Sequence, residues 1–213
     1  MRIYCFSGLG ADQRVFQYLE IMAEYTLVPV AWIDPNPNES IEQYAARIAK
    51  NIKDQEPFGI MGLSFGGVIA QEVAKILHPA FTFIISTIEE KKQIPFMLKW
   101  TPNWMLDHAP KQLFNPPKSI ANYLFSTKQK ALLAAILDDT DPAFVKWALK
   151  ALKNWKAEGE FGPINAMCGD KDRLFKPYGE SVVVQGGGHL MVVDRAEEVS
   201  KVINDWLRQY SVN

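Results

Sequence analysis

The chain has 213 residues, of which 48% are apolar and 22% charged, and this is enough for one globular domain with a substantial core. Its formal net charge of −1 gives no electrostatic reason to expect a nucleic acid or an anionic membrane surface as a partner. No stretch reaches the roughly 18 apolar residues of a membrane span, and the apolar run at 1–6 is too short for a signal peptide. We therefore expect a cytoplasmic protein.

The cysteines and histidines give no sign of a metal site. Cys5 and Cys168 each lie in an apolar run, which is typical of small buried side chains and argues against a disulfide framework. Neither has metal-ligand residues at the usual spacing beside it, and the whole chain has three histidines. We expect no metal ion and no disulfide.

Short apolar runs alternate with helical patterns along the first part of the chain. Residues 3–6 predict a buried strand, and helical spacing of apolar residues begins at about residue 12. Residues 27–33 predict a second strand. Within it, Pro29 indicates an edge position, because proline cannot donate a hydrogen bond to a neighbouring strand.

The next predicted helix has a clear start. Ser40 and Gln43 have the spacing of a capping box, and one apolar face continues from there to about residue 52. Residues 58–63 then predict a strand and residues 66–77 a helix. Residues 81–85 predict another strand, because this run is rich in aromatic and β-branched side chains.

Residues 89–157 have a different character, with several helical patterns and no clear strand. The best-defined helix has Asp141 as its N-cap and Pro142 at its first helical position, where a missing N–H does no harm. The lysines along its polar side indicate a solvated face. Other helical patterns span residues 96–105, 120–125 and 129–137.

Strand patterns return in the last part of the chain. Residues 164–167 and 181–185 predict strands, and residues 195–209 predict a helix with one apolar stripe. Strands that alternate with helices predict an α/β fold, in which a mostly parallel sheet is covered by helices on both faces. In such sheets the functional residues lie in the loops after the carboxyl ends of the strands.

Residues 62–66 form a Gly-x-Ser-x-Gly motif between a predicted strand and a predicted helix. Ser64 would stand at the apex of this turn, with the first amides of the helix directed at the atom that its oxygen attacks. The motif alone is common, and a serine here could also simply cap the helix. A nucleophile is favoured because polar clusters follow other predicted strands, at residues 7–10, 169–172 and 186–189.

A serine nucleophile needs a base and a carboxylate that orients the base. His189 is the best candidate for the base, because it follows a predicted strand in a glycine-rich loop. His78 fits the C-terminus of a helix, and His108 lies among the helical patterns before both candidate acids. These acids are Asp170 and Asp172, either of which could instead form the turn in which both lie.

The motifs that contain Ser64, Asp172 and His189 stand in the order Ser, Asp and His, and they resemble those of the α/β-hydrolase family. The resemblance covers nearly the whole chain outside 89–157. The resemblance implies that Ser64 is the nucleophile and His189 the general base and then acid. The family's acid usually closes a Gly-x-x-Asp pattern, which favours Asp172. The backbone N–H groups of Leu9 and Phe65 would form the oxyanion hole.

Ser7 is a departure from the family. The loop that supplies the oxyanion hole usually reads His-Gly-x-Gly, whereas this chain has Ser7 before Gly8. The amide of Leu9 needs no particular side chain at position 7, so we expect the oxyanion hole to be retained. The imidazole that usually supports the loop is nevertheless missing.

A second departure concerns the size of the sheet. The family's first two strands have no counterpart here, because the predicted strand at 3–6 matches the one before the oxyanion loop. The resemblance therefore implies one α/β-hydrolase domain, residues 1–213, with about six parallel strands. Residues 89–157 would be a helical cap inserted after the strand at 81–85.

The aromatic residues of this predicted cap have two interpretations. Trp100, Trp104 and Met105 are candidates for an apolar pocket that receives the acyl group of a substrate. Trp147 and Trp155 lie on one helical stripe, which is more typical of core residues.

These inferences predict a serine hydrolase that cleaves a carboxylic ester or thioester of a small, largely apolar substrate through an acyl-enzyme, without a cofactor. The same triad could instead serve acyl transfer, C–C bond hydrolysis or perhydrolysis. Haloalkane dehalogenase and epoxide hydrolase chemistry is disfavoured, because those relatives place a carboxylate where Ser64 stands. The fold can also serve as a non-catalytic ligand receptor, and no oligomeric state follows from the sequence.

Overall fold

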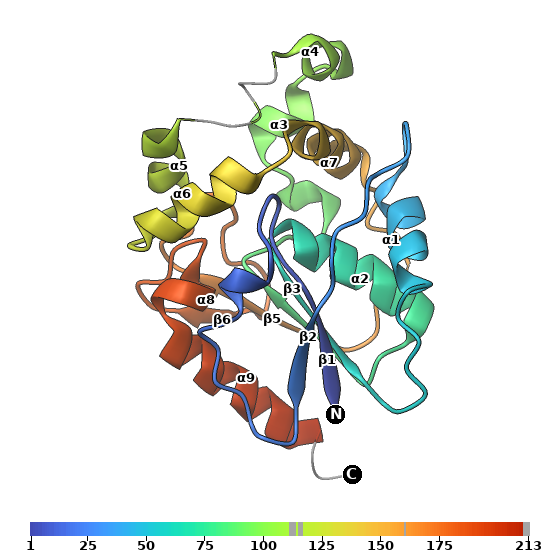
Figure 1. The fold of residues 1–213 in the computed structure, drawn as a ribbon, viewed down its shortest axis with the longest axis vertical. Coiled ribbons are helices and arrows are strands. Elements are labelled where there is room, and N and C mark those ends of the chain that lie inside the picture. The colour runs from blue at the N-terminus through green and yellow to red at the C-terminus, as the bar shows by residue number, and fades with distance from the viewer. Residues whose placement is uncertain (111–113, 115–116, 160, 211–213) are drawn as a thin grey trace.

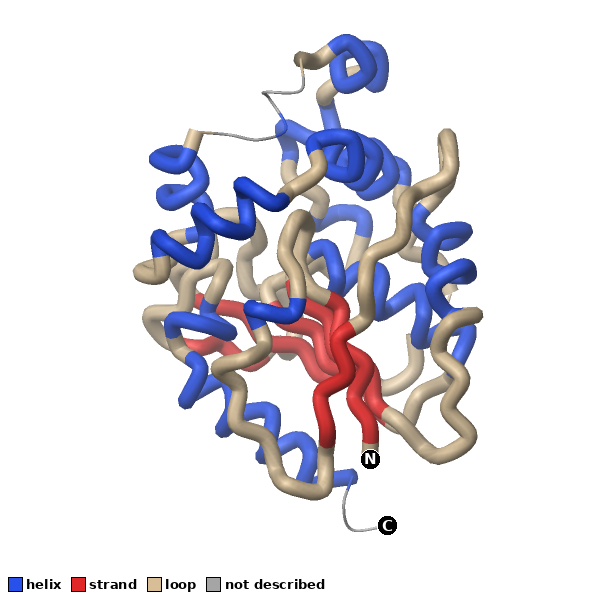
Figure 2. The backbone as a smooth tube through the Cα atoms, in the orientation of Figure 1, coloured by secondary structure: helices blue, strands red, loops and turns tan. Residues whose placement is uncertain are grey.

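A computed structural model, which describes residues 1–110, 114, 117–159 and 161–210, contains one sheet of six parallel strands (Figures 1 and 2). This confirms the predicted α/β fold and its strand number. From edge to edge the strands are β2 (Thr26–Pro29), β1 (Arg2–Phe6), β3 (Gly59–Leu63), β4 (Phe81–Ile85), β5 (Ile164–Gly169) and β6 (Val182–Val184). Pro29 ends the edge strand β2, as predicted, and the apolar β3 and β4 are central and fully buried.

Helices cover both faces of the sheet (Figure 1). Side chains that alternate along β1 enter two different cores: Ile3 and Cys5 face one, and Tyr4 and Phe6 the other. The Ile3 face is covered by the 3-10 turn η1 (Gln13–Val15), α8 (Met191–Asp194) and α9 (Ala196–Tyr210), and the Tyr4 face by α1 (Ile41–Ala49) and α2 (Phe65–Leu77).

Local sequence signals account for several of these helix boundaries. Ser40 and Gln43 form the predicted capping box at the start of α1, with each side chain bound to the other residue's backbone N–H. The helical spacing after residue 12, however, gives only the short turn η1, which is capped by Asp12. Its apolar residues are still buried, because the irregular segment that follows η1 packs on α9: the amide of Glu20 donates a hydrogen bond to Ser200 there.

A group of helices lies between β4 and β5 in the chain and beyond the carboxyl ends of the strands, at the top of Figure 1. It comprises the 3-10 turn η2 (Lys91–Gln93) and the helices α3 (Phe96–Trp100), α4 (Asn103–His108), α5 (Lys118–Phe125), α6 (Lys130–Asp139) and α7 (Pro142–Asn154). The helix predicted at 96–105 is two helices, because Pro102 cannot continue α3 and stands at the start of α4.

Helix α7 connects this group to the rest of the molecule. At its end Trp155 is fully buried, as predicted, and its indole N–H donates to Glu72 of α2 at 2.7 Å. The lysines on the polar side of α7 contact α4 at the surface: Lys150 pairs with Asp107 at 2.5 Å, and Lys146 donates to the carbonyl of the same residue. Half-exposed ion pairs of this kind stabilise by only a fraction of a kcal/mol, so they orient α4 more than they stabilise it.

Cys5 and Cys168 are buried free thiols, in agreement with their assignment as small core side chains. Within the described part of the chain, no helix has both the length and the apolar character that crossing a bilayer would require.

Glycine at position 66 is required by a close approach between α2 and β1. A Cβ there would lie 2.1 Å from the carbonyl oxygen of Ser7. We expect Gly66→Ala to lower the free energy of unfolding by about 2–3 kcal/mol, because the backbones must separate. Gly162→Ala is the control: Gly162 has a positive φ of 70°, but a Cβ there would meet no atom of the other residues within 4 Å, so strain alone should cost about 1 kcal/mol. Urea denaturation measures both, and equal losses would contradict the steric account.

Candidate functional site

Ser64 lies in the sharp turn between β3 and α2, with φ +55° and ψ −124°. Few residues with a side chain adopt this conformation, which costs on the order of 1–3 kcal/mol. Hydrogen bonds hold it: the amide of Ser64 donates to Ile85 at 2.9 Å, and the hydroxyl of Thr87 donates to the Ser64 carbonyl at 2.6 Å. The Ser64 side chain makes no capping hydrogen bond to α2, which excludes the alternative of a simple helix cap.

His189 follows β6 and is buried against aromatic rings. Its backbone N–H donates to the carbonyl of Phe125 at 3.1 Å, and its ring centroid lies 5.3 Å from that of Phe125 and 5.6 Å from that of Phe175. Nδ1 lies 2.9 Å from a carboxylate oxygen of Asp172, and Nε2 lies 2.8 Å from the hydroxyl of Ser64. Since the carboxylate can only accept, we assign the proton to Nδ1, which leaves Nε2 to accept the Ser64 proton.

Asp172 is fully buried, and every hydrogen bond that it accepts favours its ionised form. Its other oxygen accepts the backbone N–H groups of Leu174 and Phe175 at 2.8 and 3.0 Å. Burial is the largest single influence on the pKa of Asp172, and it raises that pKa. The hydrogen bond and charge of His189 together with the two amides outweigh burial, so that the pKa lies below its usual value.

Asp170, the other candidate acid, connects two loops. Its carboxylate accepts the backbone N–H of Gly186 at 2.6 Å and lies 3.5 Å from the ammonium of Lys171. Asp172 therefore combines the two roles that the sequence left open, because it contacts the imidazole and accepts two amides of its own turn. Asp170 instead ties the loop after β5 to the loop after β6.

The two other histidines serve helix ends. His78 is the C-cap of α2 in the left-handed conformation, with φ +47°. His108, at the end of α4, is exposed and donates from Nδ1 to the carbonyl of Trp104 at 2.8 Å. Neither has a hydrogen bond to Ser64 among the described contacts.

The two segments predicted to supply oxyanion donors lie against Ser64. A Cβ on Gly8, the residue before Leu9, would be 3.4 Å from the Cβ of Ser64, which brings the Leu9 segment beside the nucleophile's position. Phe65 is the first residue of α2, where backbone N–H groups have no acceptor within the helix.

Sequence reasoning missed several residues that shape these loops. The amide of Gln71, which is fully buried, donates to the carbonyls of Gly67 and Ile88 at 3.1 and 2.8 Å. Thr87, in the same loop after β4, holds the Ser64 carbonyl. A glutamine inside a helical stripe and a threonine after a strand carry no motif, so composition and spacing offered no signal for either.

The contact between Ser7 and Trp32 was also not predicted from the sequence. The hydroxyl of Ser7 donates to the carbonyl of Ala11 at 2.6 Å and accepts the indole N–H of Trp32 at 3.0 Å. Ser7 is 3% exposed. The side chain at position 7 is therefore buried and engaged as both donor and acceptor.

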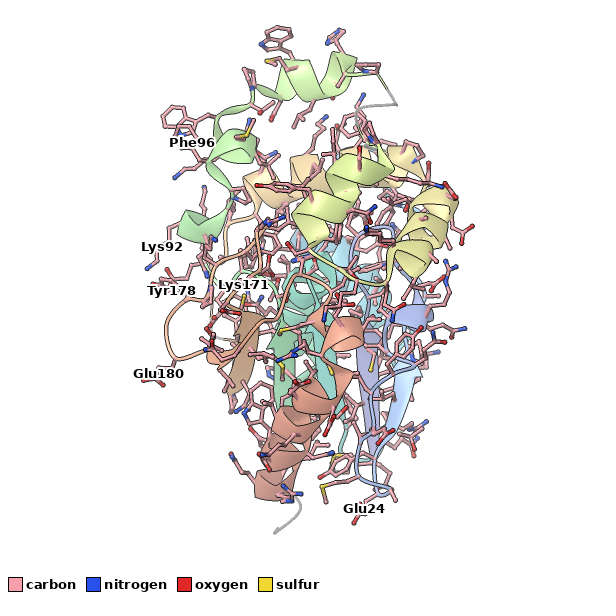
Figure 3. All side chains as sticks on the ribbon, turned by 90° about the vertical axis from the view of Figure 1, so that its left-hand side faces the viewer. Glu24, Lys92, Phe96, Lys171, Tyr178 and Glu180 are labelled. Carbon is pink, nitrogen blue, oxygen red and sulfur yellow. The ribbon has the colours of Figure 1, made fainter. Side chains whose placement is uncertain are left out.

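The residues predicted to line an acyl pocket lie elsewhere. Trp100, Trp104 and Met105 are exposed by 69%, 65% and 48%, whereas a pocket would bury them. The reason is that α4 buries Leu106 and leaves its other apolar residues outside. Figure 3 shows Phe96, at the start of α3, likewise pointing away from the body of the molecule.

A groove of about 610 Å³ lies between the loop at 34–40 and α7, lined in part by Phe144 and Trp147. Neither Ser64 nor His189 is among its lining residues. Among the described residues, no group of three or more His, Cys, Asp and Glu side chains could hold a metal ion. The hydrogen-bonded side chains around Ser64, and not the groove, thus define the candidate site.

A scan against models of protein families finds no match, and a search of curated proteins finds no relative. Solved structures do match. An esterase from Thermogutta terrifontis has a TM-score of 0.76 at 15% identity, covering 98% of this chain and 90% of its own. A hydrolase from Oleispira antarctica has a TM-score of 0.75 at 14% identity, covering 98% and 91%.

A thioesterase of the prodiginine biosynthetic pathway in Streptomyces coelicolor is also similar, with a TM-score of 0.64 at 17% identity over 94% of this chain and 84% of its own. Matches at these identities concern the fold. With the parallel sheet and its covering helices, they show that the chain has the α/β-hydrolase fold.

The lowered pKa of Asp172 makes a prediction about stability. In the unfolded chain the carboxyl titrates near 3.8, and its ionised form favours the folded state above that value. This contribution is lost as the pH falls through the lower pKa of the folded state. Asp172→Asn should therefore destabilise the protein most at about pH 7 and least at about pH 3, as measured by urea denaturation. A difference that is constant or grows on acidification would contradict it.

Proposed function

We propose that this protein is a serine hydrolase that cleaves a carboxylic ester or thioester of a small, largely apolar substrate. The observation that carries the proposal is the hydrogen-bond chain from Ser64 through His189 to Asp172, with lengths of 2.8 and 2.9 Å. Nucleophile, base and orienting carboxylate are already within the distances that proton transfer requires.

The first step is attack of the Ser64 oxygen on the acyl carbon, while Nε2 of His189 takes the hydroxyl proton. The imidazole becomes a cation at this moment, and the ionised carboxylate of Asp172 stabilises it. Asp172 also keeps the proton on Nδ1, so that Nε2 is always the free acceptor. Its low pKa suits this role, since a carboxylate held in the ionised form does not take the proton itself.

Attack turns the carbonyl oxygen into an oxyanion, which needs hydrogen-bond donors that are already in position. The backbone N–H groups of Leu9 and Phe65 are the proposed donors. Phe65 offers the open N-terminal amide of α2, and the close approach of Gly8 to Ser64 supports the neighbouring Leu9 amide as the second donor. The N-terminus of α2 adds a favourable dipole at the same point.

Collapse of this intermediate expels an alcohol or thiol, which takes the proton from His189 and leaves an acyl-enzyme on Ser64. Water, deprotonated by His189, then releases the acid. No step requires a cofactor. The rings of Phe125 and Phe175 against the imidazole support an apolar substrate, and esterases and a thioesterase among the similar structures support the bond that is cleaved.

A fluorophosphonate probe should label the wild-type protein and fail to label Ser64→Ala, because only an activated serine reacts with it. Ser86→Ala is the matched control, since Ser86 is a buried serine at the end of a neighbouring strand whose hydroxyl has no partner among the described residues. Mass spectrometry of the labelled peptide locates the adduct. Equal labelling of wild type and Ser64→Ala, or none in either, would sink the proposal.

Turnover should separate the two aspartates. Asp172→Asn should lower kcat on chromogenic esters by roughly three to four orders of magnitude, because the imidazole loses its orienting charge and its tautomer. Asp170→Asn should lower it less than about tenfold, since the side-chain contacts of Asp170 are with Gly186 and Lys171 and not with the imidazole. Acyl esters and thioesters of increasing length, measured in parallel, define the substrate. A larger effect of Asp170→Asn would overturn the assignment.

A further inference from the structure

We propose that Trp32 is a positioning residue that holds both segments of the oxyanion hole, the Leu9 segment through a hydrogen bond and the Phe65 segment through its ring. The inference rests on the proposed function and concerns how its charge-stabilising amides are kept in place. Trp32 lies in the loop after β2, outside every motif that the sequence offers.

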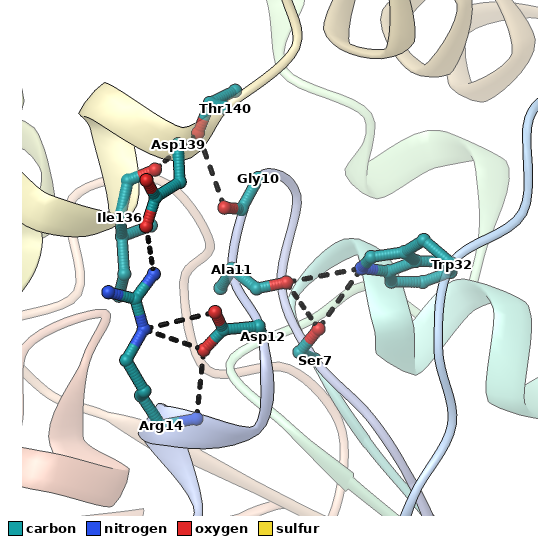
Figure 4. A network of polar contacts seen from close by, with 9 residues as sticks. All are labelled: Ser7, Gly10, Ala11, Asp12, Arg14, Trp32, Ile136, Asp139 and Thr140. Carbon is teal, nitrogen blue, oxygen red and sulfur yellow. Dashed lines mark hydrogen bonds and ion pairs between the residues drawn. The ribbon is translucent and has the colours of Figure 1, made fainter.

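The indole N–H of Trp32 hydrogen-bonds to the loop between β1 and η1 (Figure 4). The indole N–H lies 3.0 Å from the Ser7 hydroxyl and 3.3 Å from the Ala11 carbonyl, and the Ser7 hydroxyl donates to that carbonyl at 2.6 Å. The amide of Ala11 donates to the carbonyl of Gly8 at 3.0 Å. Three polar groups thus meet at the base of a loop whose middle residue is Leu9, so the direction of the Leu9 amide depends on them.

The ring of the same side chain packs against the other segment. Its centroid lies 5.9 Å from that of Phe65, the residue directly after Ser64, and 6.4 Å from that of Phe6 at the end of β1. Phe65 is 4% exposed. The Trp32 side chain therefore contacts Phe6, at the end of the strand that leads to the Leu9 loop. It also contacts the side chain of Phe65, whose backbone N–H is the other proposed donor.

A second set of contacts holds the far side of the loop (Figure 4). Thr140, after α6, lies with its hydroxyl 3.2 Å from the carbonyl of Gly10 and 2.7 Å from that of Ile136, which share its one hydrogen. Arg14 bridges Asp12 and Asp139, at 2.9 and 2.6 Å.

The ion pairs of Arg14 are solvent-exposed, and the Thr140 hydrogen favours Ile136, the nearer of its two acceptors. The Ser7 hydroxyl is buried and receives its hydrogen bond from the half-buried Trp32, so this pair is the main constraint on the shape of the loop.

Position matters here because an oxyanion donor acts only within a narrow range of distance. Donors need to lie about 2.7–3.1 Å from the oxyanion, and a misplacement of about 1 Å costs roughly a hundredfold in rate. The carbonyl oxygen of the bound substrate does not yet carry the negative charge that it gains in the transition state. Loosening the loop should therefore lower kcat and leave KM nearly unchanged.

Trp32→Phe keeps an aromatic ring beside Phe65 and removes the indole N–H. We expect it to lower kcat on a chromogenic acyl ester by between about tenfold and about a hundredfold, with KM changed less than about twofold. Ser7→Ala should do the same. The double variant should lose less than the product of the two single effects, because both substitutions break one shared link.

Trp155→Phe is the matched control. It removes a buried indole N–H that donates at 2.7 Å to Glu72, on the far part of α2, so it tests general loss of stability with the same chemical change. Its kcat should stay within about twofold of wild type. Hydrogen exchange of peptides that contain residues 7–11 gives a readout without turnover, and exchange there should rise in Trp32→Phe and not in Trp155→Phe.

The inference is overturned if Trp32→Phe retains wild-type kcat, if KM rises while kcat is unchanged, or if Trp155→Phe loses as much kcat. Exchange at residues 7–11 that is the same in wild type and Trp32→Phe also overturns it. Failure of the proposed function shows differently: wild type is then not labelled by the fluorophosphonate probe. A labelled wild type with an indifferent Trp32→Phe rejects this inference alone.

Discussion

The backbone of Ser64 has a φ of +55°, a conformation that an L-residue keeps only when its surroundings fix it on both sides. On one side, Gly66 lets α2 approach the end of β1 so closely that no side chain would fit between them. On the other side, Thr87 and Ile85 bind the Ser64 carbonyl and amide from β4 and its loop. The strain is therefore balanced by contacts with two neighbouring strands. The same contacts leave the hydroxyl free of α2 and available to His189.

Much of the fold and most of the central site could be predicted because their signals are local or ordered along the chain. A capping box, a proline at an edge strand and the alternation of strands with helices each depend on residues close in sequence. The residues Ser64, Asp172 and His189 stand after β3, β5 and β6. Parallel strands bring the loops at their carboxyl ends to one edge, so strand order alone predicts that these side chains converge.

What the sequence could not provide depends on contacts between segments that no periodicity connects. Trp32 and Ser7 are 25 residues apart and belong to different loops, and nothing in either segment indicates that they meet. The helical spacing after residue 12 predicts a helix that tertiary packing reduces to one turn. The apolar pocket assigned to Trp100 and Trp104 fails for a similar reason: composition marks a residue as apolar, but only packing decides whether its side chain faces inward.

The helices between β4 and β5 reach the proposed chemistry at three separate points. Phe125 of α5 packs on the imidazole of His189 and accepts the hydrogen bond of its amide. Thr140, between α6 and α7, touches Gly10, where a Cβ would lie 2.3 Å from the threonine hydroxyl, so this contact also requires the glycine. Phe144 of α7 lies 5.6 Å from the ring of Trp32.

Each contact adjoins a different part of the site: the base, the oxyanion loop and the side chain that holds it. A shift of these helices relative to the sheet would therefore disturb proton transfer and charge stabilisation together. In this arrangement the helices between β4 and β5 form part of the framework that keeps the proposed catalytic groups in register.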